Sequence, residues 1–252
     1  MNDEEIEIRE CLSVEQLSDC VALQREVFAL PEIEISPVRH FIVTRHAGGF
    51  TLGAFTNDNE LVGFVLSVPA YFGNERFFYS HMAAVKREFQ SAGIGAKLKW
   101  AQREKALEKG VKFIKWTFQP VQTRNAFFNL EKLGAIIKNY EPNFYGTDYS
   151  TVADQTKSIG LDSDRLFAEW HLESEKVEKL ARGEKYSESG AVVKRIEVGF
   201  DWNRLVKTAP LAAVAEQTRI KNEFQKAFAE GLVCRAFERG ADVSKYLLYA
   251  AS

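Results

Sequence analysis

The stretch Phe77–Gly110 constrains the fold more than any other part of the sequence, because it joins a predicted strand to a predicted helix through a glycine-bearing loop. The loop core, residues 90–95, reads QSAGIG. Glycines with small neighbours let the backbone come close to a ligand. Consecutive amides at the start of a helix form a concave donor site, and the helix dipole adds partial positive charge there. This pattern favours a bound anion such as a pyrophosphate.

Two other kinds of phosphate site do not fit this loop. No Lys-Ser or Lys-Thr pair follows the second glycine, Gly95, so the loop is not that of a nucleoside triphosphatase. The three-glycine dinucleotide fingerprint and its acidic partner on a following strand are also missing. A nucleotide-binding protein is therefore the least favoured interpretation. Since a two-glycine loop alone also fits a tight turn without a ligand, the order of the surrounding elements has to decide.

The composition is that of a folded protein without a strong charge bias. Apolar residues make up 46% of the 252 residues and 19 residues are Phe, which is enough for a sizeable core. The length suits one large domain, or one domain with a smaller appendage. The 33 basic and 35 acidic residues give a net charge of -2. A nucleic-acid-binding protein usually has a basic excess, so we expect no nucleic-acid partner.

The sequence gives no sign of a membrane segment or a metal site. The acidic N-terminus, MNDEEIEIRE, lacks the apolar centre of a signal peptide, and no apolar run approaches the ~20 residues that span a bilayer. Cys11, Cys20 and Cys234 show neither metal-ligand spacing nor a disulfide framework. Cys20 lies in an apolar helical stripe and is expected to be a buried thiol. We expect a cytoplasmic protein with no metal.

Hydrophobic periodicity and turn residues predict alternating strands and helices, and hence an α/β fold. Strands are expected at 6–9, 50–56, 61–68, 77–85, 111–118, 135–140 and 165–172. Helices are expected after the capping residue Ser13, after the glycine loop as far as Gly110, and at about 123–133. Alternation on the strand 77–85 places five side chains on one face: Phe77, Tyr79, His81, Ala83 and Val85. On the helix after the loop, the expected stripe is Ile94, Leu98 and Ala101.

The last third of the chain looks like a smaller unit that follows a linker. Residues 175–190 are polar and charged and are the favoured linker. A strand at 192–198, a helix at about 210–230 and a hairpin of 232–238 with 245–250 are expected beyond it. This tail is too short for a large core of its own, so it is expected to pack on the rest. We divide the chain into a domain of residues 1–174 and a C-terminal α/β extension of residues 175–252.

The order strand, Gln-x-x-Gly-x-Gly, helix, strand, Asn-Ala and a helix ending in Lys-Leu-Gly is similar to that of the GNAT N-acetyltransferase superfamily. Residues 5–172 carry this resemblance, which is most specific over Phe77–Gly134. Arg124–Asn129 and Asn143–Gly146 also resemble patterns of longer, uncharacterised acetyltransferase-like proteins. The resemblance implies the GNAT fold, a mixed and splayed central sheet with flanking helices. The segment 231–237 further resembles the end of a truncated second GNAT unit.

The resemblance implies acetyl-CoA, or another short acyl-CoA, as the cofactor. Its pyrophosphate would be held by the amides of Gln90, Ser91, Ala92, Gly93, Ile94, Gly95 and Ala96. The main chain of Ala83, Ala84 and Val85 would pair with the pantetheine arm, as an added strand does. Asn125 matches a family Asn that contacts the cofactor. Lys86 and Arg87 would either attract the 3′-phosphate or form a solvated strand end.

The reaction that the resemblance implies is direct attack of a primary amine on the thioester, which needs a base to remove a proton from the amine. The segment Tyr79–Val85 is similar to the aralkylamine N-acetyltransferase segment that carries two histidines. Tyr79 replaces the first of these histidines and His81 matches the second. His81 is therefore the candidate base, and histidine has a suitable intrinsic pKa. The alternative for His81 is a hydrogen-bonded structural residue.

One position departs from the family pattern. Many members place a Tyr in the next helix, where it protonates the departing thiolate, and the matching residue here is Leu130. Tyr140, Tyr145 and Tyr149 lie downstream, and Tyr145 is the preferred substitute. A CoA thiolate can also leave without an acid. A catalytically silent acyl-CoA-binding or regulatory module is the alternative to an enzyme. The expected partner is a small-molecule or peptide amine, and a homodimer is left open.

Overall fold

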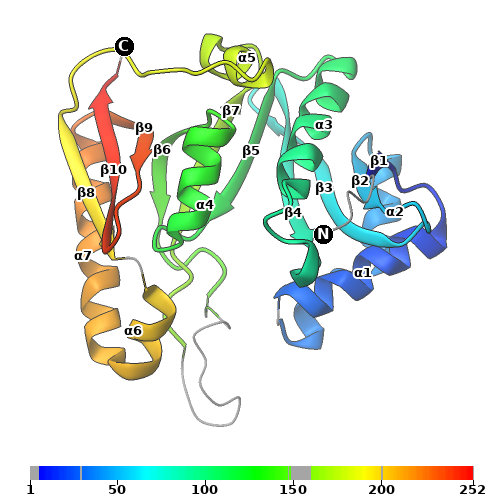
Figure 1. The fold of residues 1–252 in the computed structure, drawn as a ribbon, viewed down its shortest axis with the longest axis horizontal. Coiled ribbons are helices and arrows are strands. Elements are labelled where there is room, and N and C mark those ends of the chain that lie inside the picture. Colours follow the sequence, from blue (N-terminus) through cyan, green and yellow to red (C-terminus); the bar gives the residue numbers. More distant parts are fainter. Residues whose placement is uncertain (1–5, 29, 147, 149–159, 200, 252) are drawn as a thin grey trace. The chain divides into compact units, whose positions relative to one another are not determined.

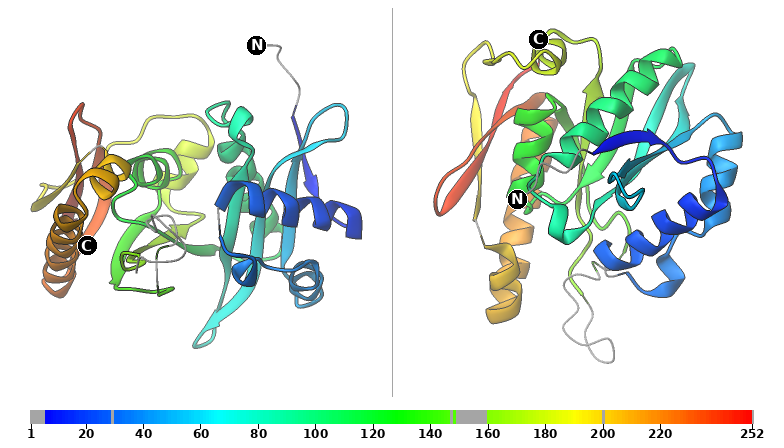
Figure 2. Two further views of the ribbon diagram at one scale, coloured as in Figure 1. Left: turned by 90° about the horizontal axis from the view of Figure 1, so that it is seen from below. Right: turned by 45° about the vertical axis from the view of Figure 1, so that its right-hand side comes forward.

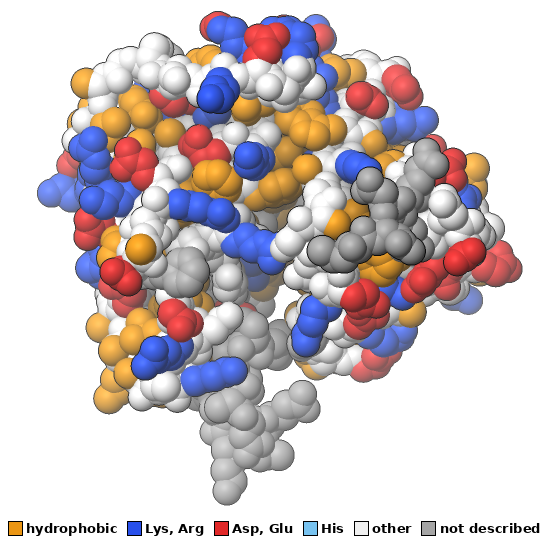
Figure 3. All heavy atoms as spheres, in the orientation of Figure 1, with side chains coloured by type: hydrophobic (Ala, Val, Ile, Leu, Met, Phe, Trp, Pro, Cys, Tyr) orange, Lys and Arg blue, Asp and Glu red, His pale blue; other side chains and the backbone are white. Residues whose placement is uncertain are grey.

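The computed structural model describes residues 6–28, 30–146, 148, 160–199 and 201–251. The chain forms two compact units, Met1–Lys115 and Trp116–Ser252. Both mix helices with strands, which confirms the predicted α/β class (Figure 1). On the face drawn in Figure 3, basic and acidic side chains are interspersed, in keeping with the balanced composition. Within the described ranges, none of the helices combines the length and the apolarity needed to cross a bilayer.

The first unit is built on an antiparallel sheet whose strands follow the order of the sequence. The strands are β1 Glu7–Glu10, β2 Phe50–Phe55, β3 Leu61–Phe72 and β4 Glu75–Val85. The predicted hairpin of β2 and β3 is confirmed. Strand β5, Phe113–Phe118, begins at the end of this unit and runs parallel to β4, where Phe78 pairs with Ile114 and Tyr79 with Lys115.

Helices cover both faces of this sheet. The helices α1 (Val14–Phe28), η1 (Glu32–Glu34) and α2 (Val38–His46) precede β2, and η2 (Arg87–Phe89) and α3 (Ile94–Glu108) follow β4. Phe41 of α2 packs on Phe64 of β3, with ring centroids 5.9 Å apart. Next along β3, a side chain at Gly63 would meet Leu98 of α3 at 3.1 Å. Since neighbouring strand residues point to opposite faces, α2 and α3 lie on opposite sides of the sheet.

The predicted alternation along β4 holds for Tyr79 and His81, whose rings lie 6.4 Å apart, but it is wrong beyond His81. Ser67 of β3 pairs with Ser80, whereas Leu66 pairs with Met82, so His81 is an extra residue in β4, a β-bulge. A bulge lets two successive side chains point to the same face and reverses the alternation beyond it. His81 therefore faces α2, and Val85 lies on the α3 face, near the position that a side chain at Gly63 would take. Sequence alternation alone does not reveal such an insertion.

The second unit contains a mixed set of helices and a sheet ordered β7-β6-β9-β10-β8. Its strands are β6 Ile136–Glu141, β7 Arg165–His171, β8 Lys194–Gly199, β9 Leu232–Glu238 and β10 Val243–Ala250. Its helices are α4 Thr123–Phe127, the π-helical η3 Phe128–Lys132, α5 Glu175–Ala181, α6 Trp202–Thr208 and α7 Pro210–Ala229. Helix α7 lies along the sheet (Figure 2) and buries Ala213, Ile220, Phe224 and Ala227.

The sequence indicated a linker at residues 175–190. The structure shows that this segment is not a plain linker. It contains α5, whose Val177 is fully buried. Lys176 bridges the far end of the segment to the sheet, because its Nζ lies 2.7 Å from Glu188 Oε1 and 2.5 Å from the carbonyl oxygen of Arg235. Residues 175–252 thus pack with β6 and β7 in the second unit, as expected for the tail. The division at residue 174 into an acyltransferase domain and an extension stays a prediction.

Candidate functional site

The glycine loop leads from the end of β4 into α3, as the sequence predicts. Gly93 has φ of +80°, a left-handed conformation that glycine adopts without steric cost, and it precedes the first residue of the helix. The first hydrogen bonds of the helix run from the amides of Ala96 and Lys97 to the carbonyl oxygen of Gly93. The amides of Ile94 and Gly95 therefore have no acceptor inside the helix. They are the donors that a helix N-terminus offers to an anion.

The space beside this helix N-terminus is open. A side chain at Gly93 or at Gly95 would meet no heavy atom of the described structure within 4 Å. The first turn of α3, which is described in full, contains no acidic residue, and no side chain caps it. Gln90, Ser91, Ala92 and Gly93 are all exposed. The start of the helix therefore combines two amides without an acceptor inside the helix, room and a favourable dipole, and these properties suit a pyrophosphate.

The loop is tied to the end of the strand by Gln90. Its side-chain Nε2 donates to the carbonyl oxygen of Val85 at 3.1 Å. The contact holds the start of the loop against the predicted pantetheine-pairing segment, in which Ala83 is exposed and Ala84 is buried. Lys86, the next residue, forms an ion pair with Glu60, which raises the pKa of Lys86 mainly through that hydrogen bond. It is thus engaged within the protein rather than extended into solvent.

His81 lies against a second histidine that the sequence analysis did not single out. The rings of His81 and His40 are nearly parallel, with centroids 5.4 Å apart and 14° between their planes. The ring of Tyr79 lies 6.4 Å from that of His81. Burial lowers the pKa of His81, and the nearby His40 lowers it further. His81 is therefore neutral at pH 7, the form in which an imidazole accepts a proton.

A buried polar network lies beneath the bulge, on the α3 face of the sheet. Lys99 Nζ donates to Gln102 Oε1 at 2.6 Å and to Ser80 Oγ at 3.1 Å. Gln102 Nε2 donates in turn to Ser67 Oγ at 2.7 Å. Ser67 and Ser80 are the paired residues that border the bulge, so the network fastens the two strands next to His81. The predicted stripe was wrong at Ala101, which is only half-buried, because these polar residues take the buried positions.

We expect Lys99 to make the stability of the protein increase with pH. Burial lowers its pKa well below the ordinary value, so the unfolded chain binds more protons than the folded one between the folded pKa and about 10.4. The free energy of unfolding should rise by up to about 1.4 kcal/mol per pH unit in that window. Urea unfolding of the wild type and of Lys99→Met between pH 7 and 10 tests this. The two stabilities should diverge in favour of the wild type as the pH rises.

The matched control for this prediction is Lys97→Met, which removes an exposed lysine from the same helix. Its stability should run parallel to that of the wild type over the whole range. Parallel curves for Lys99→Met as well would contradict the account of a buried, weakly basic lysine.

The second unit carries the other predicted site residues. Asn125 is exposed on α4, and Leu130 in the π-helical η3 is fully buried, so this leucine serves the core. Tyr145 is 51% exposed, its hydroxyl lies 3.5 Å from Thr117 Oγ1, and the guanidinium of Arg165 lies 5.0 Å from its ring centre. The role of Tyr145 as an acid stays a prediction. Tyr149 lies outside the described residues.

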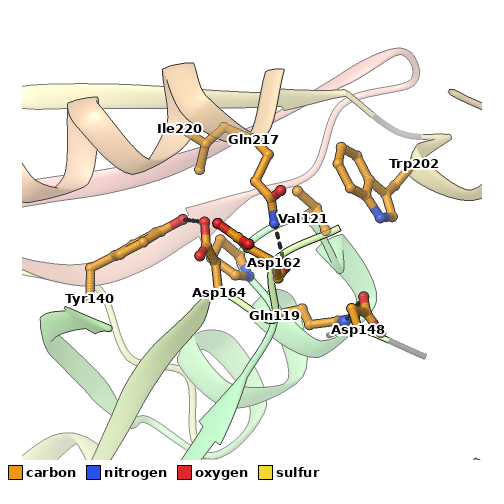
Figure 4. Close-up of a pocket in the computed structure, with 10 residues that line it drawn as sticks. Gln119, Val121, Tyr140, Asp148, Asp162, Asp164, Trp202, Gln217 and Ile220 are labelled. Carbon is orange, nitrogen blue, oxygen red and sulfur yellow. Dashed lines mark hydrogen bonds between the residues drawn. The ribbon is translucent and has the colours of Figure 1, made fainter. Parts of the chain in front are cut away.

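Tyr140, the other candidate acid, is engaged within a small pocket of the second unit (Figure 4). Its hydroxyl points at Asp164 and donates to Oδ2 at 2.6 Å. Burial and this carboxylate raise the pKa of Tyr140 far above its ordinary value. The same pocket contains Asp162, whose carbonyl oxygen accepts from Gln217 at 2.7 Å. A phenol held in this way keeps its proton, so Tyr140 is a structural residue.

Two features of the site had weak signals in the sequence. His40 follows Pro37 and Val38 in a short helix without clear periodicity, so nothing indicated that it would meet His81. Lys99 and Gln102 are spaced three residues apart on α3, which puts them on one face of a helix. That spacing was readable, but polar residues are normally assigned to the exposed face.

Comparison with known families agrees with this geometry. The profile of the Acetyltransferase (GNAT) family matches residues 17–135, which include β2 to β4, the glycine loop and α3. None of the curated proteins compared with the sequence matches it. Over residues 17–135 the chain is thus similar to the acetyltransferases of the GNAT family.

Solved structures show the same fold. The ribosomal-protein-S18-alanine N-acetyltransferase from Escherichia coli is 13% identical, with a TM-score of 0.51 over 75% of this chain and 99% of the other. An N-acetyltransferase from Staphylococcus aureus Mu50 is 14% identical, with a TM-score of 0.52 over 67% and 99%. A chain of the NatC complex bound to Gag peptide and CoA is 18% identical, with a TM-score of 0.52 over 67% and 99%. These likenesses extend the shared fold beyond residue 135.

Proposed function

We propose that this protein is an acyl-CoA-dependent N-acyltransferase that transfers an acetyl group from acetyl-CoA to a primary amine by direct attack. The observation that carries the proposal is the open helix N-terminus at Gly93, where the amides of Ile94 and Gly95 have no acceptor inside the helix. It lies directly after the strand that holds His81. A phosphate-binding loop and a candidate base on adjoining elements are what this reaction needs.

The residues of the loop fit the cofactor. The amides from Gln90 to Ala96 would hold the pyrophosphate, and Gln90 keeps the loop against the end of β4. The main chain of Ala83 to Val85 would pair with the pantetheine arm. When bound, acetyl-CoA supplies the thioester on which the amine acts. Asn125 is kept as a further cofactor contact on the basis of its match to the family position.

His81 would remove the proton that an ammonium group must lose before it can attack. Its pKa is lowered by burial and by His40, so the imidazole is neutral at pH 7 and can accept that proton. Tyr79 lies beside it with a ring-centre distance of 6.4 Å and would help to orient the amine. Tyr145 would protonate the departing thiolate in place of the Tyr that the family has at the position of Leu130.

The acceptor is proposed to be a small-molecule or peptide amine. The Escherichia coli neighbour is an alanine N-acetyltransferase of a ribosomal protein, and the NatC structure contains a peptide, so peptides with free N-termini belong in the first acceptor panel. Release of CoA thiol from acetyl-CoA should occur with at least one amine and not without an amine. Acetyl-CoA binding with no thiol release for any acceptor would favour the catalytically silent module. The buried Leu130 is the observation in support of that alternative, because it replaces the family's Tyr.

A further inference from the structure

The stacked histidines of the first unit have an unusual arrangement. His40 comes from α2 and His81 from the bulge of β4, and their rings lie nearly parallel with centroids 5.4 Å apart. The Nε2 atom of His40 is hidden from solvent and has no hydrogen-bond partner among the residues that the structure describes. A hidden imidazole nitrogen without a partner destabilises the fold. Such an unsatisfied group calls for an explanation other than the stability of the fold.

The groups around the pair are few. Tyr79 lies on the same strand as His81, at 6.4 Å, and Phe41 meets His40 edge-on on α2, at 6.3 Å. Within the described ranges, His40 is the titratable group that lowers the pKa of His81, in addition to burial. Two imidazolium rings at this separation, partly removed from water, repel each other strongly. A proton on one ring therefore disfavours a proton on the other.

We propose that His40 and His81 form a two-imidazole proton acceptor, and that this pair, rather than His81 alone, receives the proton of the acceptor amine. The inference deepens the acetyl transfer proposed above and rests on it. His40 acts through His81 as a positioning residue: its ring holds the His81 ring in place, and its presence adds to the burial that lowers the pKa of His81. The unpartnered Nε2 of His40 gives the proton a second place within the pair.

The proton balance of the step is simple. The ammonium group of the acceptor gives one proton to the neutral pair, which becomes singly charged. The amine nitrogen then forms a bond to the thioester carbonyl carbon, and the carbon–sulfur bond breaks with its electron pair going to sulfur. The second proton of the nitrogen goes to the thiolate, which yields an amide and a CoA thiol. The pair returns its proton to water, and no other reactant is needed.

The pair is tested first without any turnover, by following the imidazole C–H signals in a pH titration by NMR. His40→Phe keeps an aromatic ring next to His81 and removes the titrating nitrogens, and His40→Gln serves if the Phe variant does not fold. We expect His81 to titrate at a distinctly higher pH in either variant than in the wild type. His46→Gln is the matched control, because His46 is exposed at the end of the same helix and should leave the titration of His81 unchanged.

The second readout is the pH–rate profile of acetyl transfer with acetyl-CoA and an active amine. His40→Phe should lower kcat at least about tenfold and move the acid limb to higher pH, with the KM for acetyl-CoA unchanged. If His81 titrates identically in the wild type and in His40→Phe, and both proteins bind acetyl-CoA, the proposal that the two histidines act as a pair is overturned. The proposed acetyl transfer would still stand. Failure of the wild type to bind acetyl-CoA overturns the proposed function itself, even if the two histidines titrate as a pair.

Discussion

Gly93→Trp is expected to weaken acetyl-CoA binding by at least about 100-fold, which corresponds to about 2.7 kcal/mol. The indole would stand in the open space next to the free amides of Ile94 and Gly95, where the pyrophosphate is proposed to lie. The fold should survive, because a side chain at this position meets no heavy atom within 4 Å in the described structure. The φ of +80° would cost a tryptophan about 1–2 kcal/mol of stability. Calorimetric titration with acetyl-CoA measures the effect.

A matched control is available at Gly73, in the turn between β3 and β4. Its φ is +58°, and a side chain there also meets no described heavy atom within 4 Å. Gly73→Trp therefore introduces the same bulky residue at a similarly strained position, away from the loop. We expect a similar loss of stability and unchanged acetyl-CoA affinity. If Gly93→Trp bound acetyl-CoA as tightly as the wild type, the loop would be only a turn.

His81→Gln is expected to lower kcat by about 10²–10⁴-fold, the usual contribution of a general base, with little change in the affinity for acetyl-CoA. Glutamine fills a similar volume and can accept a hydrogen bond, but it cannot take up a proton at neutral pH. Residual activity should increase towards high pH, where the acceptor amine is deprotonated by solvent. Steady-state rates between pH 6 and 10, with acetyl-CoA affinity measured separately, test this prediction.

The control for His81→Gln is the same substitution at the exposed His46, which should leave both kcat and the pH profile unchanged. The wild-type rate should fall on the acid side with an apparent pKa below the ordinary value of about 6.5, because burial lowers the pKa of His81. An unchanged pH profile in His81→Gln would exclude His81 as the base. The alternative, a hydrogen-bonded structural residue, would then stand.

Local patterns predicted the first unit well wherever a local interaction sets the structure. Ser13 was predicted to cap the first helix, and its Oγ accepts from the amide of Gln16 at 3.2 Å. The side chain of Gln16 accepts in return from the amide of Ser13 at 3.1 Å, which completes a capping box. Gly110, at φ of +70°, follows α3 as expected. In both cases, the residues that determine the structure are neighbours in the sequence. Such local structure can therefore be predicted from the sequence alone.

Non-local contacts explain what the sequence did not predict. The bulge at His81 depends on how β4 pairs with β3, where Ser67 and Ser80 are register partners and both accept from Gln102. The buried positions of Lys99 and Gln102 depend on hydroxyl groups supplied by those two strands. Such a network is invisible to hydrophobic periodicity, because that method assigns polar residues to the surface.

The second unit shows the same contrast. The helix α7 and the hairpin of β9 and β10 were predicted from their periodicity and are confirmed. Helix α6 was missed, although Asp201 provides a readable cap, since its carboxylate accepts from the amide of Arg204 at 3.0 Å. Residues 175–190 were taken for a linker because of their charge. Lys176 and Glu188 are instead bound to each other, a contact between residues on either side of a turn.

For the candidate site, the sequence predicted the glycine loop but not the side chain that lies against His81. The order of Gln90, Gly93 and Gly95 between a strand and a helix is a local signal, and the loop does join β4 to α3. Its role in holding the cofactor stays a prediction. The partner of His81 comes from α2, which is separated from β4 by two intervening strands in the sequence. Only the folded sheet brings His40 and His81 together.

The central claim is that the loop at Gly93 binds acyl-CoA, and a single calorimetric titration of the wild-type protein with acetyl-CoA tests it most directly. The account predicts saturable binding with one equivalent of acetyl-CoA per chain, a melting temperature that rises as the ligand is added, and competition by CoA but not by ATP or NAD. Absence of any binding heat, together with an unchanged melting temperature at saturating acetyl-CoA, would contradict the claim and leave the GNAT domain as a fold without its usual ligand.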